Sequence, residues 1–281
     1  MIQVADHSQN ETVAPYNRES SAKVSLIVAV NNDRVLNTTL LASPGVNDHC
    51  QIILKRGFRS AGSAYNSGLS EANEEILVFA HQDVFLPTAW FEDLERAVKR
   101  VAAADPNWGV LGVFGVTRSS PADYRGYCYS TGLQAILGDH FEEPMEAQSL
   151  DELVLVIRHS SGLSFDEHLP GFHLYGTDIC LRAKQLGKKS YIIPAFCLHN
   201  SNGVARLPKD FWSAYFYLRR TWWQTLPVVT CCTTLSRHAM PAIKSIVRDL
   251  LAPVFPARTP GHRVDDVVKL YDSLAQQLRH R

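Results

Sequence analysis

The stretch of sequence that decides the fold is Ile76-Leu77-Val78-Phe79-Ala80-His81-Gln82-Asp83-Val84. Its first five residues are apolar, and three polar residues follow at once. A short, wholly apolar run is typical of a strand buried on both faces, as in a mainly parallel sheet covered by helices. Ligands of such sheets bind beyond the carboxyl ends of the strands, where His81 and Asp83 fall. The stretch therefore predicts that these two side chains, two residues apart, face one ligand.

A carboxylate at such a strand end is suited to hold a hard divalent cation that carries a phosphate-bearing ligand. The structural alternative for Asp83 is an ordinary acidic residue of a strand-to-helix loop, where it caps the helix that follows. The motif taken alone favours neither interpretation.

The composition excludes several classes of protein. The 281 residues suffice for one large α/β domain, and the formal net charge is zero, which gives no sign of a nucleic-acid partner. The six cysteines form no CxxC pair, which argues against a zinc ribbon or a disulfide scaffold. The polar first 23 residues lack a secretory core, and no later apolar run is long enough to span a bilayer. The sequence therefore predicts a soluble, cytoplasmic protein.

Strand-like and helix-like segments alternate along the chain. Strands are expected at 24–30, 51–54, 76–80, 110–116, 153–157 and 191–196, and helices at 34–42, 62–72, 88–104 and 178–185. The alternation predicts βαβ units and an α/β fold with a mainly parallel sheet flanked by helices. We expect a flexible tail (1–22), one sheet domain (23–203) and a C-terminal helical extension (204–281).

Several motifs follow one another in a set order. They are the apolar first strand, Tyr65-Asn66-Ser67-Gly68-Leu69, the His-Gln-Asp-Val motif at 81–84, Phe165-Asp166-Glu167, Gly176-Thr177-Asp178-Ile179-Cys180-Leu181-Arg182, and His199. This succession resembles the nucleotide-sugar glycosyltransferases of the GT-A fold, family 2 type, and the His-Gln-Asp-Val variant looks most like a bacterial, StrF-like branch. The resemblance covers about 24–203. It implies a Rossmann-like GT-A domain that moves a sugar from a nucleoside diphosphate sugar to a hydroxyl of a carbohydrate or glycoconjugate acceptor.

The resemblance also implies a divalent metal, Mn²⁺ or Mg²⁺, held by Asp83 and His199. His81 replaces the usual first acid of an Asp-x-Asp pattern, and contact with ribose or phosphate and ligation of the metal are both open for it. An imidazole ligand favours manganese somewhat over magnesium. The alternative for His199 is a structural residue of its loop.

Asp178 is the expected general base of an inverting transfer, because a carboxylate within reach of the acceptor hydroxyl can accept its proton. Its structural alternative is a cap at the N-terminus of a helix. Thr177 stands where the family usually has glutamate, and Thr177, Asp166 and Glu167 are the expected acceptor contacts. For the latter two residues, a solvated turn is an equal alternative.

The base and ribose of the donor are expected against the ends of the first two strands. Basic Arg56 follows the second strand, where relatives usually have an acid, so uridine specificity is not implied, and a surface position is its alternative. The predicted donor-side residues are Ala29, Val30, Asn31, Arg56, Asn66, His81 and Gln82.

The C-terminal region contains an aromatic stretch with two arginines, 211–223, followed by two predicted helices, 241–251 and 264–278. The stretch is expected to pack on the catalytic core, to line the acceptor groove or to rest on the inner face of a membrane. The two helices are candidates for membrane docking or for a homodimer interface.

Two other functions compete with the transferase. The departures at His81 and Thr177 are compatible with a catalytically silent GT-A-like protein that binds nucleotides or carbohydrates. A nucleotidyltransferase would need a glycine-rich phosphate loop after the first strand, which Asn31-Asn32-Asp33 does not supply.

Overall fold

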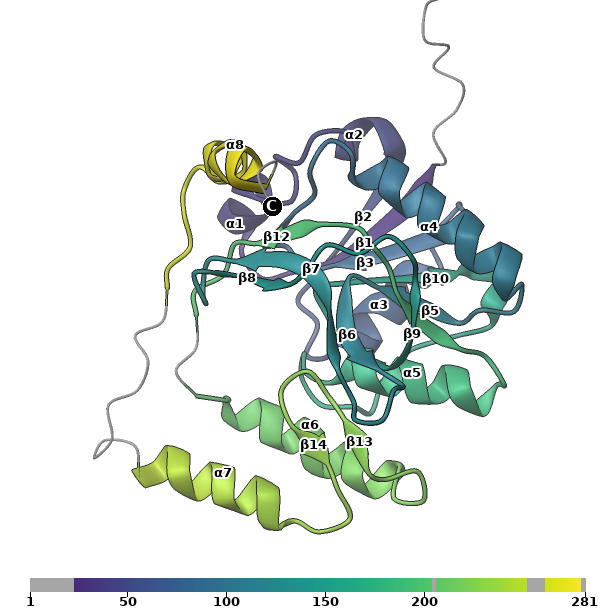
Figure 1. Cartoon of the computed structure of the whole chain (residues 1–281), viewed down its shortest axis with the longest axis vertical. Coiled ribbons are helices and arrows are strands. Elements are labelled where there is room, and N and C mark those ends of the chain that lie inside the picture. The colour runs from purple at the N-terminus through teal and green to yellow at the C-terminus, as the bar shows by residue number, and fades with distance from the viewer. Residues whose placement is uncertain (1–22, 204–205, 252–260, 279–281) are drawn as a thin grey trace, which may run out of the picture.

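The computed structural model describes residues 23–203, 206–251 and 261–278. Its centre is a twelve-stranded sheet with helices on both faces, and a separate two-stranded hairpin lies below it (Figure 1). The strands are β1 (Val24–Val30), β2 (Cys50–Arg56), β3 (Ile76–Ala80), β4 (Val84–Phe85), β5 (Val110–Gly112), β6 (Phe114–Thr117), β7 (Tyr124–Ser130), β8 (Ala135–Gly138), β9 (Met145–Leu150), β10 (Val154–Arg158), β11 (Ser190–Ile192), β12 (Cys197–His199), β13 (Val228–Val229) and β14 (Thr234–Leu235). The helices are α1 (Asp33–Thr38), α2 (Val46–His49), α3 (Ala61–Leu69), α4 (Trp90–Ala104), α5 (Tyr175–Gln185), α6 (Lys209–Thr221), α7 (Met240–Leu251) and α8 (Val267–Leu278), with a 3₁₀ turn at His159–Ser161.

The sheet is mixed, in the order β2-β1-β3-β10-β5-β11-β9-β6-β7-β12-β4, with β8 beside β7. The neighbours β2, β1 and β3 are parallel, whereas β10 runs antiparallel between β3 and β5. The expected α/β class is therefore confirmed, but the sheet is less parallel than predicted. The reasons are the reversed direction of β10 and the segment 114–150, which returns on itself as the antiparallel strands β6, β7 and β9.

Two hydrophobic cores cover the two faces of the sheet. Alternation along β1 sends Ile27 into one core and Leu26 and Val28 into the other. Helices α3, α5 and α6 contribute to the first core, and α1, α2 and α4 contribute to the second. Helix α6 thus shares a core with the sheet domain, although it belongs to the predicted C-terminal extension.

The predicted strand 76–80 is present as β3, and the turn after it brings the polar motif to the sheet edge. The Val84 N–H donates to the His81 carbonyl at 3.1 Å, and β4 then pairs antiparallel with β12. The predicted strand 191–196 is a strand only as far as Ile192, where β11 ends, because the chain leaves the sheet there and re-enters it beside β7 as β12. That second entry places His199 opposite Val84 and hence next to Asp83.

The C-terminal elements lie at opposite ends of the molecule (Figure 1). Helix α8 packs on the edge strands through a small cluster of Phe85, Leu198, Val267 and Leu274. Helix α7 lies with α6 and the β13–β14 hairpin at the other end. Among the described residues, no helix has the length and apolar character needed to cross a membrane.

Candidate active site

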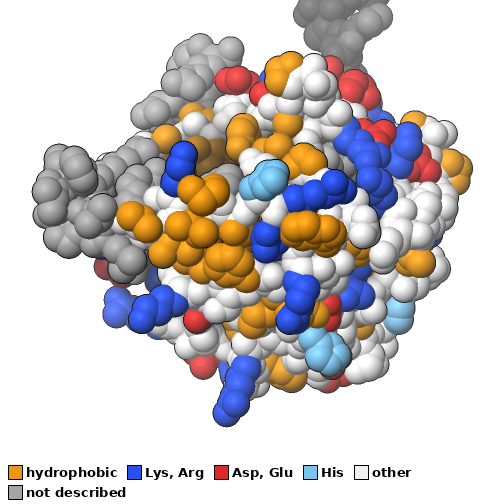
Figure 2. All heavy atoms as spheres, turned by 90° about the horizontal axis from the view of Figure 1, so that it is seen from below, with side chains coloured by type: hydrophobic (Ala, Val, Ile, Leu, Met, Phe, Trp, Pro, Cys, Tyr) orange, Lys and Arg blue, Asp and Glu red, His pale blue; other side chains and the backbone are white. Residues whose placement is uncertain are grey.

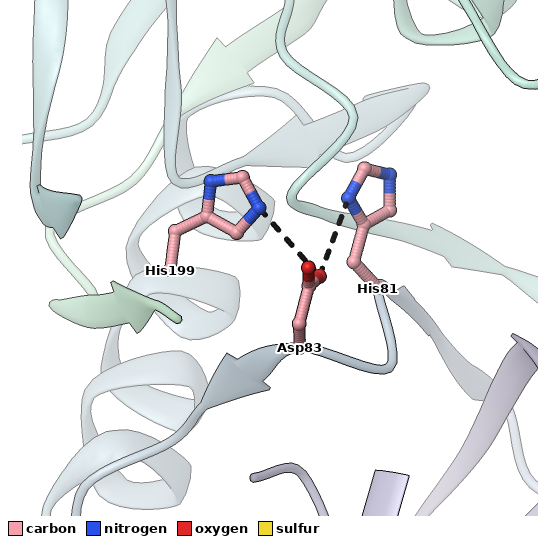
Figure 3. A group of neighbouring side chains, drawn as sticks. All are labelled: His81, Asp83 and His199. Carbon is pink, nitrogen blue, oxygen red and sulfur yellow. Dashed lines mark ion pairs between the residues drawn. The ribbon is translucent and has the colours of Figure 1, made fainter. Parts of the chain in front are cut away.

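Three side chains converge where β3 and β12 end. The rings of His81 and His199 both face the carboxylate of Asp83 (Figure 3). Asp83 Oδ1 lies 3.5 Å from His199 Nε2 and 4.0 Å from His81 Nδ1. One ligand atom from each residue lies within 4.8 Å of the others. A carboxylate oxygen and two imidazole nitrogens at this spacing fit a single divalent transition-metal ion.

The surroundings of Asp83 keep its carboxyl ionised. Burial by itself would raise the pKa of Asp83, but the hydrogen bond and charge of His199, then His81 and Arg263, outweigh it and hold that pKa well below its ordinary value. Burial has the opposite consequence for the imidazole of His81, whose pKa is lowered chiefly by loss of solvation. An ionised carboxylate beside a neutral imidazole is the protonation state that metal ligation requires.

Tyr175 orients His81 from behind. Its hydroxyl lies 2.9 Å from His81 Nε2 and 3.2 Å from the carbonyl oxygen of Glu152. Because a carbonyl can only accept, we assign the hydroxyl hydrogen to it, and the phenol oxygen then accepts from His81 Nε2–H. This tautomer leaves the lone pair of His81 on Nδ1, the nitrogen that faces Asp83.

Most of the residues predicted to bind the donor line a cavity of about 640 Å³ beside the cluster. It contains six of the seven predicted donor-side residues, namely Ala29, Val30, Asn31, Arg56, His81 and Gln82. Gln82 shapes its floor, since its side-chain oxygen accepts from the N–H groups of Asn31 and Asn32 at 3.0 Å each. Arg56 forms an ion pair with Asp33 at 2.6 Å on the cavity wall. The polar loop after β1 is therefore fastened to the central motif.

Asn66 is the predicted donor-side residue that does not line this cavity. Its amide nitrogen donates to the carbonyl of Phe165 at 2.9 Å and to Glu167 Oε1 at 3.0 Å, and its oxygen accepts from the Phe165 N–H. Asn66 thus ties α3 to the 165–167 turn. The structure gives it a scaffolding contact, and its role on the donor side stays a prediction.

A second cavity, of about 390 Å³, lies on the other side of the cluster. Its wall includes Thr177, a predicted acceptor residue, together with two acids, Asp151 and Glu152. His81 lines this cavity as well as the donor cavity, so it stands at their junction. Two cavities that meet at a metal-type cluster suit a reaction between two bound substrates.

Glu152 has unusual electrostatics in this second cavity. Burial, and then the neighbouring Asp151 carboxylate, raise the pKa of Glu152 to about 8, although the N–H groups of Leu174 and Gly176 stabilise its ionised form. Leu174 has a left-handed backbone, with φ of 62°, which begins α5 at this point. A carboxyl that titrates near neutrality in a cavity is a candidate for proton transfer.

Asp178 lines neither cavity. Its side chain is 1% exposed, accepts from Trp222 Nε1 at 2.7 Å, and forms an ion pair with Arg182 at 2.8 Å. Burial raises the pKa of Asp178, and the charge of Arg182 offsets part of that rise. The capping alternative is wrong, because α5 begins at Tyr175 and its first turn receives no side-chain cap. The role of Asp178 as general base stays a prediction.

The two other predicted acceptor residues lie away from the second cavity. Asp166 accepts from the Tyr217 hydroxyl at 2.9 Å and pairs with Arg182 at 2.7 Å. Burial would raise the pKa of Asp166, but hydrogen bonds from the His168 N–H, Tyr217 and Arg182 hold it below the ordinary value. Glu167 is exposed and bonds to Asn66. Both acids brace α3, α5 and α6 in this structure.

Several site residues were not predicted from the sequence. His173 lines both cavities, and Phe58 and Phe172, each 37% exposed, present aromatic rings on the donor side. His173 and Tyr175 lie just before Thr177 in the sequence. The aromatic residues and the histidine so close to the expected base, Asp178, were the signal from which they could have been predicted. Phe58 and Phe172 each follow a glycine with positive φ, the pattern of a turn that presents its next side chain.

The sequence model of the Glycosyltransferase like family matches residues 25–206. A curated protein of Fuscovulum blasticum, described as "ATP synthase subunits region ORF 6", is 34% identical over 145 residues, which is 49% of this chain. The chain covers 56% of that relative's length.

Solved glycosyltransferase structures show a distant likeness. The mannosyltransferase PcManGT of Pyrobaculum calidifontis, in complex with GDP-Man and Mn²⁺, is 12% identical, with a TM-score of 0.42 over 91% of this chain and 80% of that one. GalNAc-T7, with UDP, GalNAc and Mn²⁺, is 13% identical, with a TM-score of 0.44 over 74% and 52%. TarS residues 1–349 of S. aureus is 13% identical, with a TM-score of 0.43 over 70% and 64%. These likenesses are remote, and the family assignment rests on the sequence match.

Proposed function

Because this chain belongs to the Glycosyltransferase like family, we propose that it moves a sugar from a nucleoside diphosphate sugar to an acceptor hydroxyl, with inversion at the anomeric carbon. The observation that carries the proposal is the His81–Asp83–His199 cluster at the junction of two cavities. The family match supports a transferase, and the geometry supports two substrates that meet at a cation.

The donor is proposed to lie in the larger cavity. Its base and ribose would rest on Ala29, Val30 and Asn31, and the rings of Phe58 and Phe172 offer faces on which a base can stack. The diphosphate would then extend toward Asp83. Arg56 is available as a positive group on the wall, although Asp33 already engages it.

Asp83 and His199, with His81 as the third ligand, would hold Mn²⁺ or Mg²⁺. When bound, the ion would supply Lewis-acid neutralisation of the charge that develops on the departing diphosphate. Asp83 is suited to this position because its carboxyl stays ionised. Tyr175 fixes the orientation of His81, so the lone pair of Nδ1 is directed before any ligand arrives.

The acceptor, a carbohydrate or glycoconjugate, is proposed to lie in the second cavity, against Thr177 and the apolar side chains of its wall. Asp178 remains the proposed base. To accept the proton, its carboxylate would have to give up its hydrogen bond with Trp222 or its ion pair with Arg182 and bind the acceptor hydroxyl in its place. Glu152 and Asp151 already line the cavity and are the alternative bases. The substitutions Asp178→Asn and Glu152→Gln separate these assignments.

We also propose that the end of the molecule formed by α6 and α7 rests on an anionic membrane surface. Figure 2 shows this end, where hydrophobic side chains gather among Lys and Arg side chains. On α7 the exposed apolar residues Met240, Ile243 and Val247 recur with helical spacing. Trp223 is 42% exposed, with the guanidinium of Arg219 5.0 Å from its ring.

The charge at this end supports a membrane as the proposed partner over a second copy of the chain. The basic residues there include the exposed Arg220, Arg237 and Lys244. Two such faces packed together would oppose like charges, whereas anionic headgroups attract basic side chains beside an apolar stripe. A dimer through this face is therefore the outcome that would contradict the membrane proposal.

The burial of Asp178 favours one competing function, a binding protein without turnover. Titration calorimetry with UDP, GDP, TDP and CDP sugars, with and without Mn²⁺, beside an assay for released nucleoside diphosphate tests the choice. Metal-dependent binding with release in the presence of acceptor supports the transferase. Tight binding with no release under any pairing of donor and acceptor would establish the binding protein.

A further inference from the structure

A positively charged side chain, Arg263, already contacts the His81–Asp83–His199 cluster, and it comes from the C-terminal part of the chain. Arg263 Nη2 is 2.8 Å from Asp83 Oδ2, across a separation of 180 residues in sequence. Arg263 lies in the segment 261–267, which leads into α8. No step of the proposed transfer uses this residue, yet it contacts the proposed metal ligand directly.

The fold holds the backbone around Arg263 firmly. The Arg263 N–H donates to Asn202 Oδ1 at 3.0 Å, and its side-chain Nε donates to the Asn200 carbonyl at 2.7 Å. The amide of Asn200 bonds to both the N–H and the carbonyl of Val264, at 2.8 and 2.9 Å. The segment is therefore hydrogen-bonded along the loop that follows His199.

Contacts on both sides of Arg263 extend this docking. Gly261 is pressed against the chain near Thr131, where a Cβ would fall 2.0 Å from the Thr131 carbonyl oxygen. Beyond Arg263, Val267 is 1% exposed and packs with Phe85 and Leu198 on the edge strands. The backbone that carries the Arg263 side chain is thus held in place beside Asp83.

The two oxygens of Asp83 have different partners. Oδ1 faces His81 and His199, and Oδ2 is held by Arg263. When His81 and His199 are neutral, as metal ligation requires, the negative charge of Asp83 and the positive charge of Arg263 cancel. A divalent cation at the three ligand atoms would then meet four side chains with no net charge between them and a guanidinium on the far oxygen of Asp83, so it gains little Coulomb energy from them.

We propose that Arg263 makes this cation site dependent on nucleoside diphosphate, so that metal and nucleotide bind together and neither binds well alone. The proposal rests on the proposed function and deepens it. The diphosphate supplies the negative charge that the protein withholds, and its oxygens compete with Asp83 for the Arg263 guanidinium, so that Asp83 is freed for the cation when nucleotide is bound. By linkage, the nucleotide tightens metal binding by the same factor as the metal tightens nucleotide binding. Arg263 is a positioning residue, because it acts through Asp83.

The test compares Arg263→Gln with the wild-type chain by Mn²⁺ titration, followed by electron paramagnetic resonance and by calorimetry, with and without UDP or GDP. We expect wild-type protein to bind Mn²⁺ weakly alone and at least about tenfold more tightly with nucleotide. Arg263→Gln should bind Mn²⁺ alone at least about tenfold more tightly than wild type, about 1.4 kcal/mol. The tightening by nucleotide should shrink by a similar factor.

Two further variants isolate the charge at Asp83. Arg34→Gln is the matched control, because Arg34 is 79% exposed and pairs with Asp265 of the same segment at 3.1 Å. It removes one positive charge beside the segment and should leave both titrations unchanged. Arg263→Lys keeps the charge and should stay close to wild type, whereas a purely structural role of the planar guanidinium would make it behave like Arg263→Gln.

The outcomes separate this inference from the proposed function. If wild-type metal and nucleotide binding reinforce each other but a folded Arg263→Gln shows the same reinforcement, the role of Arg263 is wrong and the transferase stands. Wild-type protein that binds Mn²⁺ tightly alone, with no gain from nucleotide, also overturns it, even if Arg263→Gln does not fold. Absence of nucleotide binding in wild type would overturn the proposed function as well.

Discussion

Replacing Asp178 by asparagine distinguishes a catalytic carboxylate from a structural one. In the folded protein the carboxylate accepts from Trp222 Nε1 and pairs with Arg182. The amide oxygen of asparagine can keep the bond with Trp222, but its amide nitrogen faces another donor at Arg182. Arg182 keeps a second partner, Asp166, at 2.7 Å. One charge-assisted hydrogen bond is therefore lost, and no buried charge is left unpaired.

The expected loss of folding stability follows from this one lost hydrogen bond. A hydrogen bond to a charged group contributes about 1.5–3 kcal/mol. Because burial raises the pKa of Asp178, removal of its buried charge offsets part of the loss, so we expect the low end of that range, about 1.5 kcal/mol. For a domain of this size, such a loss lowers Tm by roughly 3–6 °C. Urea denaturation followed by tryptophan fluorescence measures it. Asp272→Asn, on the exposed face of α8, is the control and should change stability by less than about 0.5 kcal/mol.

The same Asp178→Asn protein tests the chemistry at a temperature where it stays folded. If Asp178 is the base, transfer falls by several powers of ten, while nucleotide binding changes less than about tenfold. Full transfer activity would remove Asp178 from the mechanism and leave Glu152 or Asp151 as the base. An unfolding midpoint equal to that of wild type would refute the energetic reasoning from the buried ion pair.

Three further predictions concern the metal, the pH dependence of stability and the membrane. Asp83→Ala should abolish the tightening of nucleoside diphosphate binding by Mn²⁺ in calorimetry, and unchanged metal dependence would show that Asp83 is not a ligand. The pKa of Glu152 is raised to about 8 in the folded protein, so its stabilising contribution is complete below the pKa of the unfolded chain and is lost as pH rises toward 8. Glu152→Gln cannot ionise and should therefore gain stability relative to wild type between about pH 5 and about pH 8 in urea titrations; a constant difference would contradict the raised pKa. Ile243→Glu with Val247→Glu should reduce sedimentation with anionic vesicles, whereas Leu186→Glu, at the 54% exposed residue that follows α5, should not; equal loss in both variants, or equal retention, would argue against an interface through α7.

The sequence predicted that His81, Asp83 and His199 lie close together, because its signals there are local. The run 76–80 is β3, and the polar residues after it lie at the sheet edge beside His199, as expected from strand ends that meet. Most predicted donor-side residues share one cavity for the same reason. The predicted single strand over 191–196 was wrong, because apolar content does not reveal that the chain leaves the sheet between β11 and β12.

The sequence alone determined the family of this protein and the positions of strands β1, β2, β3 and β10, since each depends on residues close together in the chain. Only the tertiary structure decided three hydrogen bonds: Tyr175 with His81, Trp222 with Asp178, and Arg263 with Asp83. These contacts join segments far apart in sequence. Their existence depends on how helices and loops pack around the sheet, and no local periodicity encodes that packing.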